Sequence, residues 1–174
     1  MKRITALALS LIMILCAVCA FAEGAGKTEI GKLQVGQAFS IQCRIPEGYT
    51  YTPDTDTELL IRGRLSAGEG KPELLVSIAY NEDYAEIERF NDVDEAGVEE
   101  IHNSFRDLDG EVTFEDLETA YGTRLLKVTG DGFVDIYTIY KHYELEFILV
   151  GEVTDADVRM LVDFISDMDF VAVE

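Results

Sequence analysis

Few residues in this chain have the types and spacing that chemistry requires. His102 and His142 are its two histidines, and they fall in different expected elements. Neither belongs to a recognised catalytic motif, and the sequence contains no glycine-rich phosphate loop and no metalloprotease motif. The 34 acidic residues place carboxylate pairs almost everywhere, so the spacing of any one pair is weak evidence for glycosidase-type acid–base catalysis. We therefore predict no catalytic residues, no cofactor and no bound metal.

The two histidines and Cys43 each have a simpler structural interpretation. His102 borders an apolar helical stripe, which favours a packed imidazole over a ligand or a base. His142 lies near a turn between strands, where an exposed or hydrogen-bonded role is favoured. Cys43 alternates with Phe39 and Ile41 as residues of a half-buried strand do, which predicts a buried thiol. A reactive or intermolecular thiol is the alternative.

The segment 107–116, DLDGEVTFED, resembles the later part of a calcium-binding loop of the EF-hand or dockerin type. Placing Gly110 at the sixth loop position puts Phe105 at the first, where it cannot coordinate calcium, and a short Asp116 at the twelfth. The residues from Glu111 onward also alternate as a strand does. These observations favour a helix-to-strand turn, with a calcium-dependent surface protein as the alternative.

The aromatic residues offer the best candidate for a binding surface. Tyr137, Tyr140, His142 and Tyr143 lie close together in the sequence, and tyrosine combines a large apolar face with a polar tip. We name these four as the candidate interaction surface. Two alternatives stay open: a core-and-rim role for the tyrosines, since tyrosine is a good strand former, and a small secreted hydrolase with a cleft near His142.

The first 22 residues have the organisation of a secretory signal peptide. Lys2 and Arg3 form a positive n-region, residues 4–18 are apolar and uncharged, and Ala20-Phe21-Ala22 is a cleavage site of the A-x-A type. We therefore expect a secreted or extracytoplasmic protein, without stable membrane insertion once the signal peptide has been removed.

The rest of the chain is expected to form one folded unit. Residues 23–36 contain four glycines and are expected to be a flexible mature N-terminus, followed by a single domain over residues 37–174. Cys43 is the one cysteine beyond the signal peptide, so an internal disulfide is excluded for the mature chain.

The acidic charge restricts the partners. The chain carries a formal net charge of −20, a field that repels nucleic acids and anionic lipids and attracts basic partners. The segment from residue 82 to residue 118 contains fifteen acidic residues and two basic ones, Arg89 and Arg106. We interpret this segment as a solvated helical surface, with a face for a basic partner or divalent cations as the alternative.

Periodicity predicts an α+β fold. Several strands are apolar on both faces, so the sheet needs cover on both sides. The expected architecture is a three-layer α/β/α sandwich around a mainly antiparallel central sheet. Residues 46–57 are expected to form a loop. The expected strands are residues 38–45, 58–65, 72–80, 111–118, 123–129, 133–141 and 143–150, and the expected helices are a short one near residues 84–90, one with Asp92 as N-cap and one with a capping box at Thr154.

This order of elements resembles the Mog1/PsbP-like family over residues 38–173. The resemblance is carried by residues 45–49 (IPEGY), 120–127 (AYGTRLLK) and 167–170 (DMDF), the last closing the final helix. It implies the α/β/α sandwich fold. Members include an extrinsic subunit of photosystem II, a nuclear-transport factor that binds a small GTPase and exported bacterial proteins of unknown role, and no functional motif transfers to this chain. The expectation is a non-enzymatic binding domain for a protein or cell-envelope component.

Overall fold

The structure is a computed structural model that describes residues 26–35, 38–109 and 111–173. The predicted signal peptide, residues 1–22, lies outside the described residues. None of the helices in the described part of the chain has the length and apolar character needed to cross a bilayer.

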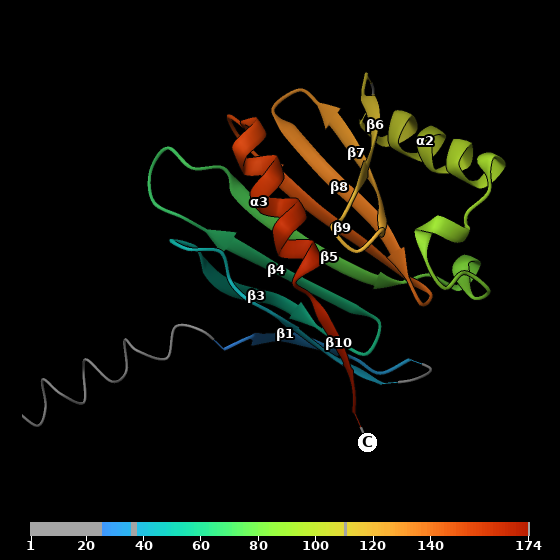
Figure 1. The fold of residues 1–174 in the computed structure, drawn as a ribbon, viewed down its shortest axis with the longest axis horizontal. Coiled ribbons are helices and arrows are strands. Elements are labelled where there is room, and N and C mark those ends of the chain that lie inside the picture. Colours follow the sequence, from blue (N-terminus) through green and yellow to red (C-terminus); the bar gives the residue numbers. More distant parts are fainter. Residues whose placement is uncertain (1–25, 36–37, 110, 174) are drawn as a thin grey trace, which may run out of the picture.

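The centre of the fold is a seven-stranded sheet, called the large sheet, with strand order β3-β4-β5-β9-β8-β7-β6 (Figure 1). Every neighbouring pair of its strands is antiparallel. The expected α+β class with a mainly antiparallel sheet is therefore confirmed. The strands are Thr50–Asp56 (β3), Leu60–Ser66 (β4), Glu73–Tyr80 (β5), Thr113–Glu118 (β6), Arg124–Gly130 (β7), Phe133–Tyr140 (β8) and Tyr143–Val150 (β9).

Both faces of the large sheet bury apolar residues, because consecutive residues of a strand point to opposite faces. On β8, Val134 and Ile136 belong to one buried cluster, whereas Tyr137 and Ile139 belong to another. The first cluster includes residues of helix α3, and the second includes residues of helix α2. The two helices therefore pack on opposite faces (Figure 1). Their bounds are Glu95–Asp109 (α2) and Asp155–Ser166 (α3).

Helix α3 begins at a capping box, as predicted. The Thr154 hydroxyl oxygen accepts the Asp157 N–H at 3.3 Å, and the Asp157 carboxylate accepts the Thr154 N–H at 3.0 Å. Two of the otherwise unsatisfied N–H groups of the helix terminus are thereby bonded. The Thr154 hydroxyl also donates to the Asp157 carboxylate at 2.6 Å, and this side-chain bond is the main cause that lowers the pKa of Asp157, with a smaller effect of the Thr154 N–H.

The segment between β5 and α2 differs from the prediction. Two short 3-10 turns, η1 (Glu82–Tyr84) and η2 (Phe90–Asp92), stand where a first helix was expected. The carboxylate at the start of α2 belongs to Asp94, which accepts a backbone N–H of the first helical turn at 2.8 Å. The predicted N-cap, Asp92, is therefore wrong by two residues. Its carboxylate instead accepts the Arg89 N–H at 3.1 Å.

A second sheet of three strands, called the small sheet, has the order β1-β2-β10. Its residues Ile30, Leu33 and Ile41 are buried in the same cluster as α3, so the small sheet covers the same face of the large sheet. The Tyr51 hydroxyl donates to the Ile30 carbonyl at 2.9 Å and links β3 to this layer. Its strands are Thr28–Leu33 (β1), Phe39–Cys43 (β2) and Asp169–Ala172 (β10).

Three expectations along the chain are wrong. Residues 28–33, expected within the flexible segment 23–36, form β1, so the folded unit begins before residue 37. Residues 50–56, expected within a loop, form the edge strand β3. Residues 167–170 were expected to close the last helix, but Asp169 and Phe170 belong to β10, which spans Asp169–Ala172.

Candidate functional site

The four residues of the predicted interaction surface are not brought together. Tyr137 faces α2 and is 3% exposed. Its hydroxyl lies 3.3 Å from the Glu144 carboxylate, to which it donates, and 3.2 Å from the Tyr84 hydroxyl. Burial is the main cause that raises its pKa far above the usual value. Tyr137 is therefore a core residue with a satisfied hydroxyl.

The other three predicted residues lie at the β8–β9 turn and point in different directions. Tyr143 is buried, and its hydroxyl donates to the Val35 carbonyl at 2.8 Å. His142 has a left-handed backbone, with φ of 73°, and its Nδ1 lies 3.0 Å from the Tyr84 carbonyl, which can only accept. Tyr140 alone borders the cleft described below. The core-and-rim interpretation therefore describes these tyrosines better than a shared surface.

The remaining chemistry-bearing residues are packed against neighbours. The His102 ring stacks on Phe114 with 4.0 Å between centroids and lies 3.6 Å from the Glu99 carboxylate. Cys43 has no exposed surface, which confirms its predicted burial. The segment 107–116 contains the end of α2 and the start of β6, as a helix-to-strand turn requires. Within the described residues, no three His, Cys, Asp or Glu side chains are grouped so that they could hold a metal ion.

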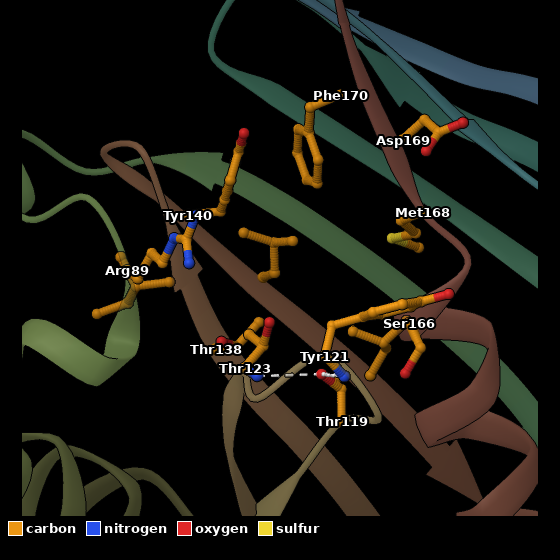
Figure 2. Close-up of a pocket in the computed structure, with 13 residues that line it drawn as sticks. Arg89, Thr119, Tyr121, Thr123, Thr138, Tyr140, Ser166, Met168, Asp169 and Phe170 are labelled. Atoms are coloured by element: carbon orange, nitrogen blue, oxygen red, sulfur yellow. Dashed lines mark hydrogen bonds between the residues drawn. The ribbon is translucent and has the colours of Figure 1, made fainter.

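A cleft of about 390 Å³ lies beside β8, on the face that α3 covers (Figure 2). One wall is the turn between β6 and β7, residues 119–123, and the opposite wall is the end of α3 with the start of β10. Leu145, Ile165 and Met168 contribute apolar surface to it. Its volume and its apolar lining with a few polar groups are typical of a binding pocket for a small molecule or a side chain.

The turn 119–123 holds an exposed tyrosine in a defined position. The buried Thr119 hydroxyl oxygen accepts the Thr123 N–H at 3.1 Å and the Tyr121 N–H at 3.3 Å. Gly122 has a φ of 78°, which glycine adopts without strain, and its carbonyl accepts from the Asn91 side chain at 3.0 Å. Tyr121 itself is 82% exposed. The turn therefore presents a large aromatic side chain to solvent at the edge of the cleft.

Aromatic and charged groups complete the cleft. The rings of Tyr140 and Phe170 lie 4.2 Å apart between centroids with an interplanar angle of 34°. Arg89 is exposed at the rim, and Figure 2 shows its guanidinium pointing toward Tyr140. Arg89 forms no ion pair with any described residue, whereas Asp169 is paired with Lys27 at 2.9 Å. The cleft therefore offers one cation whose hydrogen-bonding groups are available to a ligand.

Two hydroxyl groups that line the cleft are hydrogen-bonded to the backbone. The buried Thr138 donates to the Arg124 carbonyl at 3.0 Å, and the half-buried Ser166 donates to the Val162 carbonyl at 2.7 Å. A hydroxyl nucleophile needs an adjacent base, and neither hydroxyl is hydrogen-bonded to one. What the arrangement provides is apolar contact, aromatic stacking and an arginine.

Sequence reasoning missed the residues that shape the cleft, namely Arg89, Tyr121 and Phe170. Two of them carry a signal in the sequence. Arg89 is one of two cations in the acidic segment, and Tyr121 precedes a glycine between two expected strands, where a turn exposes its side chain. Phe170 lies in β10, and its position depends on pairing with β2, more than 120 residues away in the chain.

The comparisons with known proteins do not add a family. No protein-family model matches the sequence, and no curated protein matches it. The cleft itself is therefore the basis for a functional proposal.

Proposed function

We propose that this protein is an exported, acidic, non-enzymatic binding domain that engages a protein or another cell-envelope component through the cleft beside β8. The observation that carries the proposal is an apolar lining bordered by two exposed side chains, Tyr121 and Arg89, of which Arg89 forms no ion pair with a described residue. Tyrosine and arginine are enriched among the residues that dominate binding energy at protein interfaces. An 82% exposed tyrosine held by a hydrogen-bonded turn also loses little backbone freedom on binding.

Charge and location support the same proposal. The signal-peptide pattern of residues 1–22 favours an extracytoplasmic location. The net charge of −20 disfavours nucleic acids and anionic membrane surfaces as partners and attracts basic ones.

We further propose that the fold is a three-layer α/β/α sandwich of the Mog1/PsbP-like type. The packing of α2 and α3 against opposite faces of the large sheet supports this proposal. The small sheet beside α3 would then be an addition to the outer layer. A shared fold of this kind does not specify the partner.

Site-specific photo-cross-linking in the native host tests the binding function. A photoreactive p-benzoylphenylalanine placed at position 121 is expected to form a covalent adduct with the partner, and Arg89→Ala in the same chain is expected to weaken that adduct. The matched control carries the same group at position 108, because Leu108 is 84% exposed but lies on α2. The absence of an adduct from position 121, or an equal adduct from position 108, would reject the cleft as the binding site.

A further inference from the structure

The outer edge of β10 faces the cleft. β10 pairs with β2 on one side and ends the small sheet on the other. At the opposite end of the small sheet, β1 contacts β3 and β4, whereas Phe170 of β10 stacks on Tyr140 of β8. Since β8 lies beyond β5 and β9 in the large sheet, the small sheet is oriented with β10 toward the cleft. Figure 2 shows Asp169 and Phe170 at the border of that cleft.

The register identifies the backbone groups on this edge. In an antiparallel pair, residues that exchange both hydrogen bonds with the partner alternate with residues whose N–H and C=O point away from it. The Val173 N–H donates to the Ala38 carbonyl at 3.0 Å, and the same register pairs Val171 with Ser40. Residues 170 and 172 therefore direct their N–H and C=O groups away from β2, toward the cleft side.

Such an edge is a template for another strand. Strands pair about 4.8 Å apart, and their side chains alternate between the two faces. A strand added beside β10 would lie over the cleft, and every second side chain would point into the apolar lining formed by Leu145, Ile165 and Met168. The far side of that strand would face Arg89, whose guanidinium can donate to backbone carbonyls.

We propose that the partner binds as an extended peptide segment that adds a strand to the free edge of β10 and inserts one apolar side chain into the cleft. This inference rests on the proposed binding function. The segment carries a net positive charge, because it approaches a protein with a net charge of −20. The same charge opposes pairing between two copies of this chain, and Asp169 on the edge strand adds to that opposition.

Backbone methylation of a bound peptide tests strand addition. Linear heptapeptides displayed on phage are selected against the purified protein, and the best binder is synthesised and measured by fluorescence anisotropy. Methylating its backbone nitrogens one at a time is expected to weaken binding at least about tenfold at alternate positions only, because every second N–H bonds to the edge. These changes are made in the peptide, so they cannot unfold the protein.

A pair of protein variants tests the same edge from the other side. Ala172→Pro removes an N–H that points away from β2, and proline is tolerated at such positions of edge strands. We expect it to weaken peptide binding at least about tenfold, because one hydrogen bond to the peptide is lost and the proline ring adds a steric conflict. Ala172→Ser keeps the N–H and is the matched control, expected to bind within about twofold of the unmodified protein. Circular dichroism of both variants verifies that the fold is retained.

The outcomes separate this inference from the proposed function. Peptide binding without alternation in the methyl scan, and unaffected by Ala172→Pro, would reject strand addition. If Arg89→Ala still weakened that binding, the cleft would stand as a binding site. Selection of no peptide, or a stable dimer of this chain in sedimentation at micromolar concentration, would reject the peptide as occupant. Absence of any photo-cross-link from position 121 in the otherwise unmodified chain would reject the cleft as the binding site and with it the proposed function.

Discussion

The Cys43 thiol is expected to react about a thousandfold more slowly in the native protein than in the unfolded chain near pH 8. Its side chain has no exposed surface. Burial, followed by the nearby Asp167 carboxylate, raises its pKa from 9.0 to about 12, against a smaller opposing effect of the Lys27 ammonium. The thiolate is the nucleophile, and its fraction falls about tenfold for each unit by which the pKa exceeds the pH. The shift from 9.0 to about 12 therefore gives the thousandfold factor, before steric exclusion of the reagent.

The assay compares labelling rates of the predicted mature chain, in which Cys43 is the single cysteine. A chromogenic disulfide reagent in excess is added at pH 8 to the protein in buffer and to the protein in concentrated urea, and the two rate constants are compared. Near-ultraviolet circular dichroism verifies that the untreated sample keeps its tertiary packing. A native rate within about tenfold of the unfolded rate would refute both the burial and the raised pKa.

The same shift has a consequence for stability at alkaline pH. The unfolded thiol ionises near pH 9.0, whereas the native thiol stays protonated up to about pH 12. Its contribution to the free energy of unfolding is therefore fully present below pH 9.0 and is lost as the pH rises toward 12, with a slope of at most about 1.4 kcal/mol per pH unit.

Urea unfolding between pH 8 and pH 11 isolates this contribution when Cys43→Ala is the control. The pKa of Tyr51 is also raised, to about 12, so the alkaline loss of stability is shared between groups. The quantity to compare is the difference in slope between the two proteins. Equal slopes would show that the thiol does not contribute.

Three further predictions concern the turns, the sheet contact and the helix cap that hold the fold together. Thr119→Val removes the acceptor of two turn N–H groups and is expected to cost about 1–2 kcal/mol in urea unfolding, whereas Thr119→Ser should cost less than about half as much. Gly63→Ala places a Cβ against the Tyr51 ring, so it should lower stability by about 1–3 kcal/mol and weaken the link between the two sheets; an unchanged melting temperature would contradict that packing. Thr154→Ala removes the two hydrogen bonds between the Thr154 hydroxyl and Asp157 and should cost about 1 kcal/mol in urea unfolding, and Thr154→Ser should restore most of it.

Local sequence signals were sufficient for the regular, strongly patterned elements. The β8–β9 hairpin has apolar residues on both faces, and Gly132, with a φ of 77°, supplies the turn that Asp131-Gly132 predicts between β7 and β8. Helix α3 has both an apolar stripe and a capping box that can be found without knowledge of its neighbours. In these segments propensity, periodicity and turn chemistry agree, so the prediction is confirmed.

The missed strands lack such agreement. In β1 the register shifts between Glu29 and Gly31, so the alternation that indicates a strand is interrupted. β3 is an exposed edge strand that contains Pro53 and a second register shift, features that make a strand appear as a loop in the sequence. β10 is four residues long and forms through pairing with a distant strand. No local pattern determines a contact of that range.

The four residues of the predicted interaction surface lie apart in the fold for a reason that the sequence contains. Tyr137 and Tyr140 are three positions apart on β8. Because consecutive side chains of a strand point to opposite faces, an odd separation places these two on opposite faces of the sheet. The structure accordingly packs Tyr137 under α2 and Tyr140 beside Phe170. Nearness in the sequence does not give nearness in space on this strand, because its side chains alternate between the two faces.

The cleft exists because the two layers of the fold differ in width. On the face covered by α3 and the small sheet, the covering layer ends at β10, whereas the large sheet continues from β8 to β7 and β6. A strip of the large sheet beyond β10 therefore stays uncovered on this face. The turn 119–123 borders the far side of this strip, and the cleft is the space between that turn and β10. A peptide strand added to β10 would extend the covering layer across that strip. Partner binding would then complete the packing of the sheet over this strip.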